Sequence, residues 1–255
     1  MKRSRKTHAC CCLSLGLGAV TCGLPAVQAA DAAAAPADPN PTGWKSSAFL
    51  GATVTKGNSD TLMVNGSAKT DKKWDKNELA FGADLTYGKD HSYVNANSVS
   101  GYGQYNRLFT DRFYGYARVD ALHDEIADIN YRVTLGPGAG YYFLKNDKFT
   151  LSGEAGPGLV MEKVANQCNN YWTVRVAEKF TWKISERSRL WEGVDYQPQV
   201  DDLGNYVVNA ELGAESDLTK HLALRVVFAD TYRSRPAPGK KDNDLKLMAG
   251  LAYRF

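Results

Sequence analysis

The sequence predicts an all-β protein: a transmembrane, up-and-down antiparallel β-barrel of about twelve strands. Three observations carry this prediction. The last eleven residues alternate apolar and polar side chains and end on Phe255. From Trp44 onward, turn signals divide the chain into segments of about the length of a tilted membrane strand. The N-terminus has the pattern of a secretory signal.

Residues 1–29 are predicted to be a removable signal peptide. A basic start (Lys2, Arg3, Arg5, Lys6) precedes an apolar stretch at 13–24, and Val27-Gln28-Ala29 is a small-residue cleavage site. The apolar stretch is shorter than the ~20 residues of a spanning helix. Residues 30–43, rich in Ala and Pro, are predicted to be a disordered periplasmic tail, so the barrel itself is expected at 44–255.

Composition excludes several functional classes. Four of the five cysteines lie within the signal, which leaves Cys168 alone and permits neither an intramolecular disulfide nor a thiolate zinc site. Without the four basic residues of the signal, 27 Lys+Arg stand against 28 Asp+Glu. A chain of this balance lacks the basic surface that nucleic-acid binding requires, so no nucleic-acid partner is expected.

Twelve strands fit the region. We expect them, in order, at 44–55, 60–71, 77–88, 93–108, 112–123, 129–144, 148–161, 171–183, 189–199, 205–216, 221–233 and 243–255. An even number returns both ends to one side, so the second, fourth, sixth, eighth and tenth connections are predicted to be short periplasmic turns. Longer outer connections are expected at 123–128, 162–170, 200–204 and 233–242, with a tight outer turn at 57–60.

The strand around 129–144 alternates best, with Tyr131, Leu135 and Tyr141 among its lipid-facing residues. In the next hairpin Pro137 falls opposite Pro157, and each lies between two glycines. Because proline removes a ladder donor, the hairpin is expected to bend there. Two interpretations remain: a barrel corner, or a glycine-lined hollow in the lumen. The strand at 93–108 has few apolar residues for a lipid face.

The final strand places Leu251, Tyr253 and Phe255 on its apolar face. An aromatic C-terminus on such a strand predicts a barrel insertion signal, and therefore the barrel-insertion machinery as a partner. Outer-membrane lipids and lipopolysaccharide are the other expected partners, the cell outer membrane is the expected location, and a monomer is favoured.

The inner face is predicted to carry charges of both signs. Candidate lumen residues are Arg118, Asp120, Arg132, Arg175, Lys179, Asp195, Glu211, Glu215 and Arg225. Turns centred on Ser185 and Thr219 predict that Arg175 lies opposite Asp195 and that Arg225 lies diagonally between Glu211 and Glu215. Such a lumen is either a polar, weakly selective path or a salt-bridged plug.

Two acids do not fit the pattern. Glu178 and Glu192 fall on predicted lipid faces and are expected to pair opposite each other. Acids that face hydrocarbon destabilise a barrel. A bulge, a position near the membrane interface or a contact between protomers would explain them.

Catalysis is not expected, and no cofactor or metal is implied. The best candidate for a surface hydrolase is His123-Asp124 with Asp201-Asp202, all predicted at the outer rim. The acids at this rim could offer oxygen ligands to calcium or magnesium, but their spacing does not match a metal-binding loop such as an EF-hand. Solvated loop charges are the simpler interpretation.

A family resemblance adds to this reading. The first strand runs into Lys56-Gly57-Asn58-Ser59-Asp60-Thr61, Gly136-Pro137-Gly138 precedes Tyr141-Tyr142-Phe143, and the chain ends Tyr253-Arg254-Phe255. In these features residues 44–255 resemble the salt-induced outer-membrane proteins of Gram-negative bacteria, a group built on a domain of unknown function. The resemblance implies an outer-membrane barrel linked to salt or envelope stress, without catalytic residues.

Together these features predict a narrow passive channel for ions or small solutes, linked to salt, osmotic or envelope stress. The alternatives are a structural envelope barrel with an occluded lumen and, more remotely, the surface hydrolase.

Overall fold

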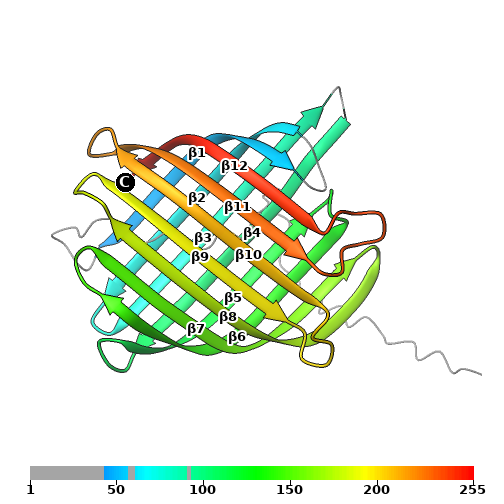
Figure 1. The fold of residues 1–255 in the computed structure, drawn as a ribbon, viewed down its shortest axis with the longest axis horizontal. Coiled ribbons are helices and arrows are strands. Elements are labelled where there is room, and N and C mark those ends of the chain that lie inside the picture. The colour runs from blue at the N-terminus through cyan, green and yellow to red at the C-terminus, as the bar shows by residue number, and fades with distance from the viewer. Residues whose placement is uncertain (1–42, 57–60, 91–92) are drawn as a thin grey trace, which may run out of the picture.

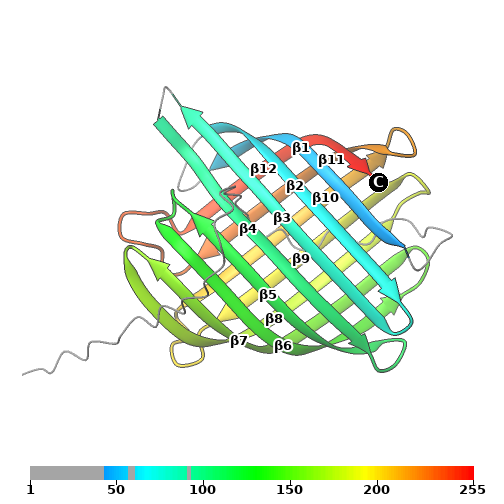
Figure 2. The same ribbon diagram turned by 180° about the vertical axis from the view of Figure 1, so that it is seen from behind.

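The computed structural model describes residues 43–56, 61–90 and 93–255, which form a closed barrel of twelve antiparallel strands (Figures 1 and 2). The predicted fold class is therefore confirmed. The predicted signal peptide, the tail up to residue 42 and the turn at 57–60 lie outside the described residues. No helix in the described part of the chain is long and apolar enough to cross a bilayer.

The strand bounds follow the predicted ones closely. They are β1 Trp44–Lys56, β2 Thr61–Trp74, β3 Asn77–Asp90, β4 Tyr93–Leu108, β5 Phe113–Asp124, β6 Ile129–Lys145, β7 Phe149–Val164, β8 Gln167–Lys183, β9 Ser188–Pro198, β10 Tyr206–Asp217, β11 Leu222–Arg233 and β12 Asn243–Arg254. Each strand pairs with its neighbours in the chain, and β1 pairs with β12 from Ser47↔Arg254 to Lys56↔Leu245 to close the cylinder.

The two faces of the wall differ in the way a membrane barrel requires. On β8, Trp172, Val174 and Val176 are 58%, 42% and 50% exposed, whereas the intervening Thr173 and Arg175 are 2% and 7% exposed. The same alternation places Leu50, Val119 and Leu212 on the outer face. Successive side chains of a strand point to opposite faces, so apolar residues meet the outside and polar residues the lumen.

The connections gather at two rims. We call the end that holds Phe255 the short-turn rim; its connections are 75–76, 109–112, 146–148, 184–187 and 218–221. The opposite end, the loop rim, carries the connections 125–128, 165–166, 199–205 and 234–242 among the described residues. The two longest connections, 199–205 and 234–242, lie at the loop rim, in line with the predicted asymmetry.

One predicted connection at the loop rim is wrong. The structure replaces the loop expected at 162–170 with a tight turn at Ala165 and Asn166, whose φ angles are 47° and 61°. Two consecutive positive φ angles are those of a type I′ hairpin turn, which matches the twist of the flanking strands. The polar residues 167–170 therefore extend β8 beyond its predicted start.

Aromatic rings lie on glycines of neighbouring strands along the inner wall. A Cβ atom added at Gly140 would lie 2.2 Å from Tyr114 Cζ, one at Gly138 would lie 2.3 Å from Tyr116 Cζ, and one at Gly213 would lie 2.1 Å from Trp191. Because glycine has no side chain, each ring occupies the space above it. Of the glycines around the predicted hollow, Gly138 thus has its space filled by a tyrosine ring, whereas Gly136 and Gly156 face backbone atoms of the opposite strand.

The paired prolines mark an irregularity in the β6–β7 ladder. Its register runs from Leu135↔Leu159 to Ala139↔Ala155, which places Pro137 opposite Pro157, and no residues are paired between those positions. A Cβ at Gly156 would lie 2.2 Å from the carbonyl oxygen of Pro137. The glycine thus permits close approach of two backbones where proline cannot donate to the ladder, which fits the barrel-corner interpretation.

The polar strand β4 uses its hydrophilic residues inward. Ser98, Ser100 and Gln104 are buried on the inner face, whereas Val99 and Tyr105 face outward. Gly101 and Gly103 occupy other outward-facing positions of β4. Because glycine has no side chain, the outer face of β4 exposes little apolar surface.

The expected pairing of Glu178 with Glu192 is wrong. Glu178 pairs with Val194, and Glu192 pairs with Phe180, because the β8–β9 turn is centred one residue later than predicted. Both carboxylates are exposed on the outer face. The β7–β8 and β8–β9 registers show no bulge, which removes the bulge as an explanation.

We expect Gly250→Ala to weaken the closing seam. Gly250 pairs with Gly51 of β1, and a Cβ at Gly250 would lie 2.1 Å from the carbonyl oxygen of Leu50, a backbone atom that cannot move without disturbing the ladder. Overpacking of this kind costs about 1–3 kcal/mol. Urea unfolding of the barrel refolded in detergent measures this loss.

The matched control is Gly66→Ala, where the nearest heavy atom to the added Cβ is 4.0 Å away. Equal stability of the two variants would contradict a tight seam.

Candidate functional site in the barrel lumen

All nine predicted lumen residues lie on the inner face of the barrel. They fall into two clusters and one separate pair. The first cluster holds Arg118, Asp120, Arg175, Lys179 and Asp195 on β5, β8 and β9; the second holds Glu211, Glu215 and Arg225 on β10 and β11; Arg132 of β6 forms a pair nearer the loop rim.

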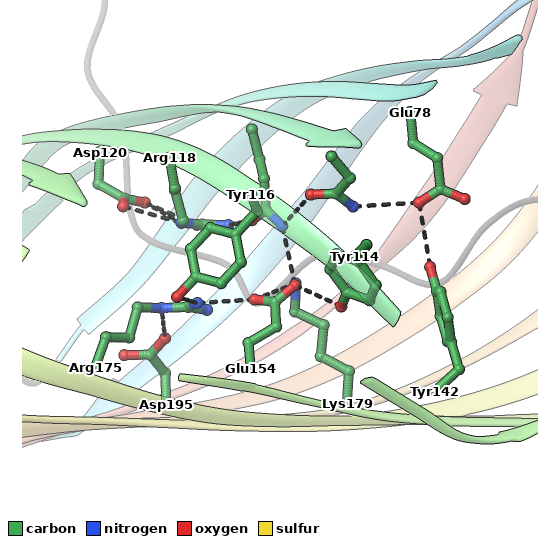
Figure 3. Close-up of polar contacts among 12 residues, drawn as sticks. Glu78, Tyr114, Tyr116, Arg118, Asp120, Tyr142, Glu154, Arg175, Lys179 and Asp195 are labelled. Atoms are coloured by element: carbon green, nitrogen blue, oxygen red, sulfur yellow. Dashed lines mark hydrogen bonds and ion pairs between the residues drawn. The ribbon is translucent and has the colours of Figure 1, made fainter. Parts of the chain in front are cut away.

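Glu154 of β7 is the centre of the first cluster (Figure 3). Its Oε1 accepts hydrogen bonds from Gln104 Nε2 and from the Tyr114 hydroxyl, both at 2.9 Å. Its Oε2 accepts from Arg175 Nη1 at 2.7 Å and lies 3.7 Å from Lys179 Nζ. Donors from β4, β5 and β8 therefore converge on a carboxylate that is 5% exposed.

Arg175 connects Glu154 to the next acid. Its Nε donates to Asp195 Oδ2 at 2.5 Å, and its Nη1 lies 3.3 Å from the Tyr116 hydroxyl. The predicted direct pairing is wrong, since Asp195 pairs with Ala177. The ion pair nevertheless forms because the long arginine side chain spans the diagonal of the ladder.

The cluster continues along the wall in both directions (Figure 3). Gln104 Oε1 accepts from Arg118 Nη1 at 2.8 Å, and Arg118 contacts Asp120 at 2.7 Å. On the other side, Asn106 joins Gln104 to Glu78, which also accepts from the Tyr142 hydroxyl and from Lys73. Polar contacts thus run without a break from β2 to β9.

The second cluster surrounds Glu215 of β10. Arg189 Nη2 lies 2.9 Å from its Oε1, Arg225 Nη2 lies 2.6 Å from its Oε2, and Arg254 makes a third ion pair with it. Arg254 also contacts Asp217 at 2.6 Å. The predicted diagonal position of Arg225 is wrong: Arg225 lies directly opposite Glu215, because the β10–β11 turn is centred one residue later than expected.

Glu211 does not join the arginines through a hydrogen bond. Its Oε1 accepts from Trp191 Nε1 at 2.6 Å instead. Nearer the loop rim, Arg132 Nε donates to Glu162 Oε2 at 2.6 Å, and Arg233 contacts Asp244 at 3.1 Å. Positive and negative groups therefore alternate along the lumen rather than dividing into one basic and one acidic wall.

Several members of these clusters were not among the predicted site residues. Glu154, Arg189 and Arg254 were missed, although each has the strand position of an inward-facing residue. Strand parity was the signal that could have found them. Tyr114 and Tyr116 share the strand parity of Arg118 and Asp120, but their residue type did not single them out, because aromatic residues occur on either face.

Each central carboxylate is surrounded by cationic or hydroxyl donors, which compensate its charge away from bulk water. The alternation of signs leaves no large field of one sign to reject either anions or cations.

The residues of the suggested hydrolase have other partners. His123 Nδ1 lies 2.8 Å from the Asn130 carbonyl oxygen, Asp124 accepts from the Ala127 amide, and Asp202 pairs with Arg235. Asp201 accepts from Gln199. Within the described ranges no group of three or more His, Cys, Asp and Glu side chains could hold a metal ion.

Comparisons with known proteins identify the fold. A family model described as "Protein of unknown function, DUF481" matches residues 48–255. A comparison with curated protein sequences found no match.

Among solved structures, the chain is similar to the NanC porin, with a TM-score of 0.56, 7% sequence identity, and 82% of this chain and 100% of that chain covered. It is also similar to the KdgM porin, with a TM-score of 0.51, 8% identity, and 82% and 99% covered. At these identities the likeness concerns the barrel architecture alone.

We expect Glu215→Gln to destabilise the barrel strongly. The change leaves Arg189, Arg225 and Arg254 without their shared carboxylate, and removing one partner of a buried ion pair costs about 3–5 kcal/mol. The effect is measured by urea unfolding of the barrel in detergent, in which the loss of the compact form is monitored.

Arg235→Gln is the control, because Arg235 pairs with Asp202 at the exposed rim, where a salt bridge contributes about 0–1 kcal/mol. If Glu215→Gln lowers the free energy of unfolding by no more than Arg235→Gln does, the idea of a buried ion-pair cluster around Glu215 is contradicted.

Proposed function

The chain belongs to the DUF481 family of proteins of unknown function, and we propose that it is an outer-membrane barrel that acts as a narrow passive channel for ions or small solutes. The observation that carries the proposal is the closed barrel with charged side chains of both signs along its inner face and apolar side chains on its outer face. Water-filled membrane barrels have this distribution.

The outer surface supports the membrane location. Exposed aromatic side chains gather near both rims: Trp44, Phe113, Tyr141 and Trp182 near the short-turn rim, and Tyr87, Tyr131, Trp172 and Tyr196 near the loop rim. Aromatic belts of this kind sit at the two membrane interfaces. In this proposal the loop rim faces outward and meets lipopolysaccharide, the barrel wall contacts lipid, and the protein is a monomer.

The C-terminal strand supports recognition by the barrel-insertion machinery. Leu251 and Tyr253 are exposed on the outer face, and the Tyr253 ring packs edge-on against Phe255 with centroids 5.1 Å apart. An accessible apolar and aromatic edge at the chain end is suited to recognition before the barrel closes.

Catalysis does not form part of the proposal. The two similar solved structures named above are porins, and the residues that could have formed a hydrolase are engaged with other groups. The proposed transport is passive.

A sealed structural barrel is the second candidate, favoured by one observation. The polar contacts that run from Lys73 through Glu78, Gln104 and Glu154 to Arg175 and Asp195 tie side chains of six strands to one another. A network with all its members satisfied is rigid, and a rigid network that fills the cross-section would block passage.

The link to salt or osmotic stress is a further part of the proposal. It rests on the resemblance of the first strand, the glycine-proline hairpin and the chain end to salt-induced outer-membrane proteins. Growth of a deletion strain in rising NaCl, against sucrose of equal osmolarity, tests it. Unchanged growth in both would reject the link and leave the channel proposal standing.

Conductance of the refolded protein in a planar bilayer tests the channel. We expect steady current that rises in proportion to the KCl concentration, because a water-filled path conducts as its contents do. A membrane that stays at its background conductance after verified insertion would reject the channel and favour the sealed barrel.

Substitutions at the central ion pair should shift ion selectivity in opposite directions. Glu154→Gln removes negative charge beside Arg175 and Lys179 and should shift the reversal potential in a KCl gradient toward anion preference. Arg175→Gln should shift it toward cation preference.

Arg112→Gln, in an exposed turn at the short-turn rim, serves as the control and should leave the reversal potential within error. Shifts of the same sign in both lumen variants would show that these groups do not face the permeating ions.

A further inference from the structure

The barrel wall has a notch at the loop rim, between the start of β8 and the connection at 199–205. It is a cavity of about 490 Å³ whose lining includes Asn169, Asn170, Tyr171, Gln199, Asp201 and Asn205. Ligand sites typically measure about 300–1,000 Å³. The notch is therefore large enough for a small solute.

The notch exists because β8 is longer than its neighbour. The β7–β8 hairpin is paired as far as Val164↔Gln167, whereas the β8–β9 ladder ends at Val176↔Tyr196. Beyond it, the two sides are joined among the described residues by the bridge Thr173↔Gln199 and by a 2.8 Å hydrogen bond from the Val200 amide to the Trp172 carbonyl.

The exposed edge of β8 also supplies backbone groups. Ladder bonds alternate along a strand, so residues two apart point their N–H and C=O groups to the same side. The Trp172 carbonyl bonds toward the 199–205 connection, and the N–H and C=O of Asn170 therefore point to that side too. Nothing in the described part of the chain pairs with them there.

The polar side chains of the notch are held in place. Asn205 Nδ2 donates to Gln199 Oε1 at 2.6 Å, and Gln199 Nε2 donates to Asp201 Oδ1 at 2.7 Å. The Gln199 amide bonds the Asn205 carbonyl at 2.8 Å. These hydrogen bonds orient the remaining N–H group of the Asn205 carboxamide and the remaining lone pairs of Asp201. On the other side of the notch, the side chains of Asn169 and Asn170 point to opposite faces of β8. Their carboxamides are exposed and have no hydrogen bond to any described residue.

The chemistry of the lining indicates the class of ligand. Carboxamides offer donors and acceptors side by side, which suits vicinal hydroxyl groups that both donate and accept. Tyr171 adds an aromatic ring with a polar end. Among the described residues that line the notch there is no lysine or arginine, and the buried Glu162 is already paired with Arg132. A strongly anionic ligand would find no counter-charge there.

The position of the notch connects it to the lumen. A smaller cavity of about 20 Å³ shares Tyr171 and Asn205 with it and is lined further by the inward-facing Arg132, Thr134 and Gln197. A solute held in the notch would thus lie beside the entrance of the barrel.

We propose that the notch is a binding site for a neutral saccharide at the outer mouth of the barrel. The outward placement of the site rests on the membrane orientation proposed above, and the saccharide would be a solute presented to the lumen. Binding itself does not require conduction, so the two proposals are tested separately.

Titration calorimetry of the full barrel refolded in detergent tests the site. The probes are two neutral trisaccharides, maltotriose and tri-N-acetylchitotriose, and one acidic trisaccharide, trigalacturonate. We expect at least one neutral probe to bind saturably and more tightly than the acidic one. Asn170→Ala should weaken that binding about five-fold or more, as expected for one lost hydrogen bond.

The matched control is Gln167→Ala, which removes an exposed carboxamide from the same hairpin outside the notch and should leave binding unchanged. Absence of binding by both neutral probes would overturn the proposal. So would stronger binding of trigalacturonate, or an equal loss in Asn170→Ala and Gln167→Ala.

Bilayer conductance on the same preparation separates this proposal from the channel. A barrel that conducts but does not bind either neutral probe retains the channel and loses the notch. A barrel that binds as expected but does not conduct retains the notch and loses the channel.

Discussion

Closure of the sheet is the constraint on which the structure depends. Hydrocarbon offers no hydrogen-bonding partners, so an open edge would leave a row of backbone N–H and C=O groups without compensation. The pairing of β1 with β12 removes that edge, and Gly51 and Gly250 let the two backbones approach at the seam. Once the cylinder is closed, the face on which each side chain lies is fixed by its parity along the strand.

Parity also explains the lumen. Residues such as Glu154, Arg175 and Glu215 cannot face lipid without a large cost, and closure gathers them inside a narrow space. There Glu154 and Glu215 each find several donors from other strands. Their mutual compensation makes the interior polar without giving it one dominant sign. The ion pairs therefore follow from closure and do not require a separate binding function.

The sequence was sufficient for the architecture and less so for the contacts. Alternation fixed the faces of β6, β7 and β8, and turn residues located the twelve strands to within a few positions. Register failed where a turn was centred one residue off: Glu178 was wrongly placed opposite Glu192, and Arg225 was placed diagonally to Glu215 instead of directly opposite it. The pairing of Arg175 with Asp195 survived a similar error because arginine is long enough to span the diagonal. The notch could not be predicted, since the extension of β8 beyond β9 depends on the Ala165–Asn166 turn, and the polar residues that follow that turn resemble a loop.

The rings laid over Gly138, Gly140 and Gly213 have a consequence for how such barrels diversify. A tyrosine or tryptophan that rests flat against a bare stretch of wall projects less toward the axis, whereas a neighbour with even a methyl group would tilt the ring inward. Exchanging such a glycine for a larger residue would therefore narrow the bore, and the reverse exchange would widen it. The width of the lumen can thus change without a change in the number of strands.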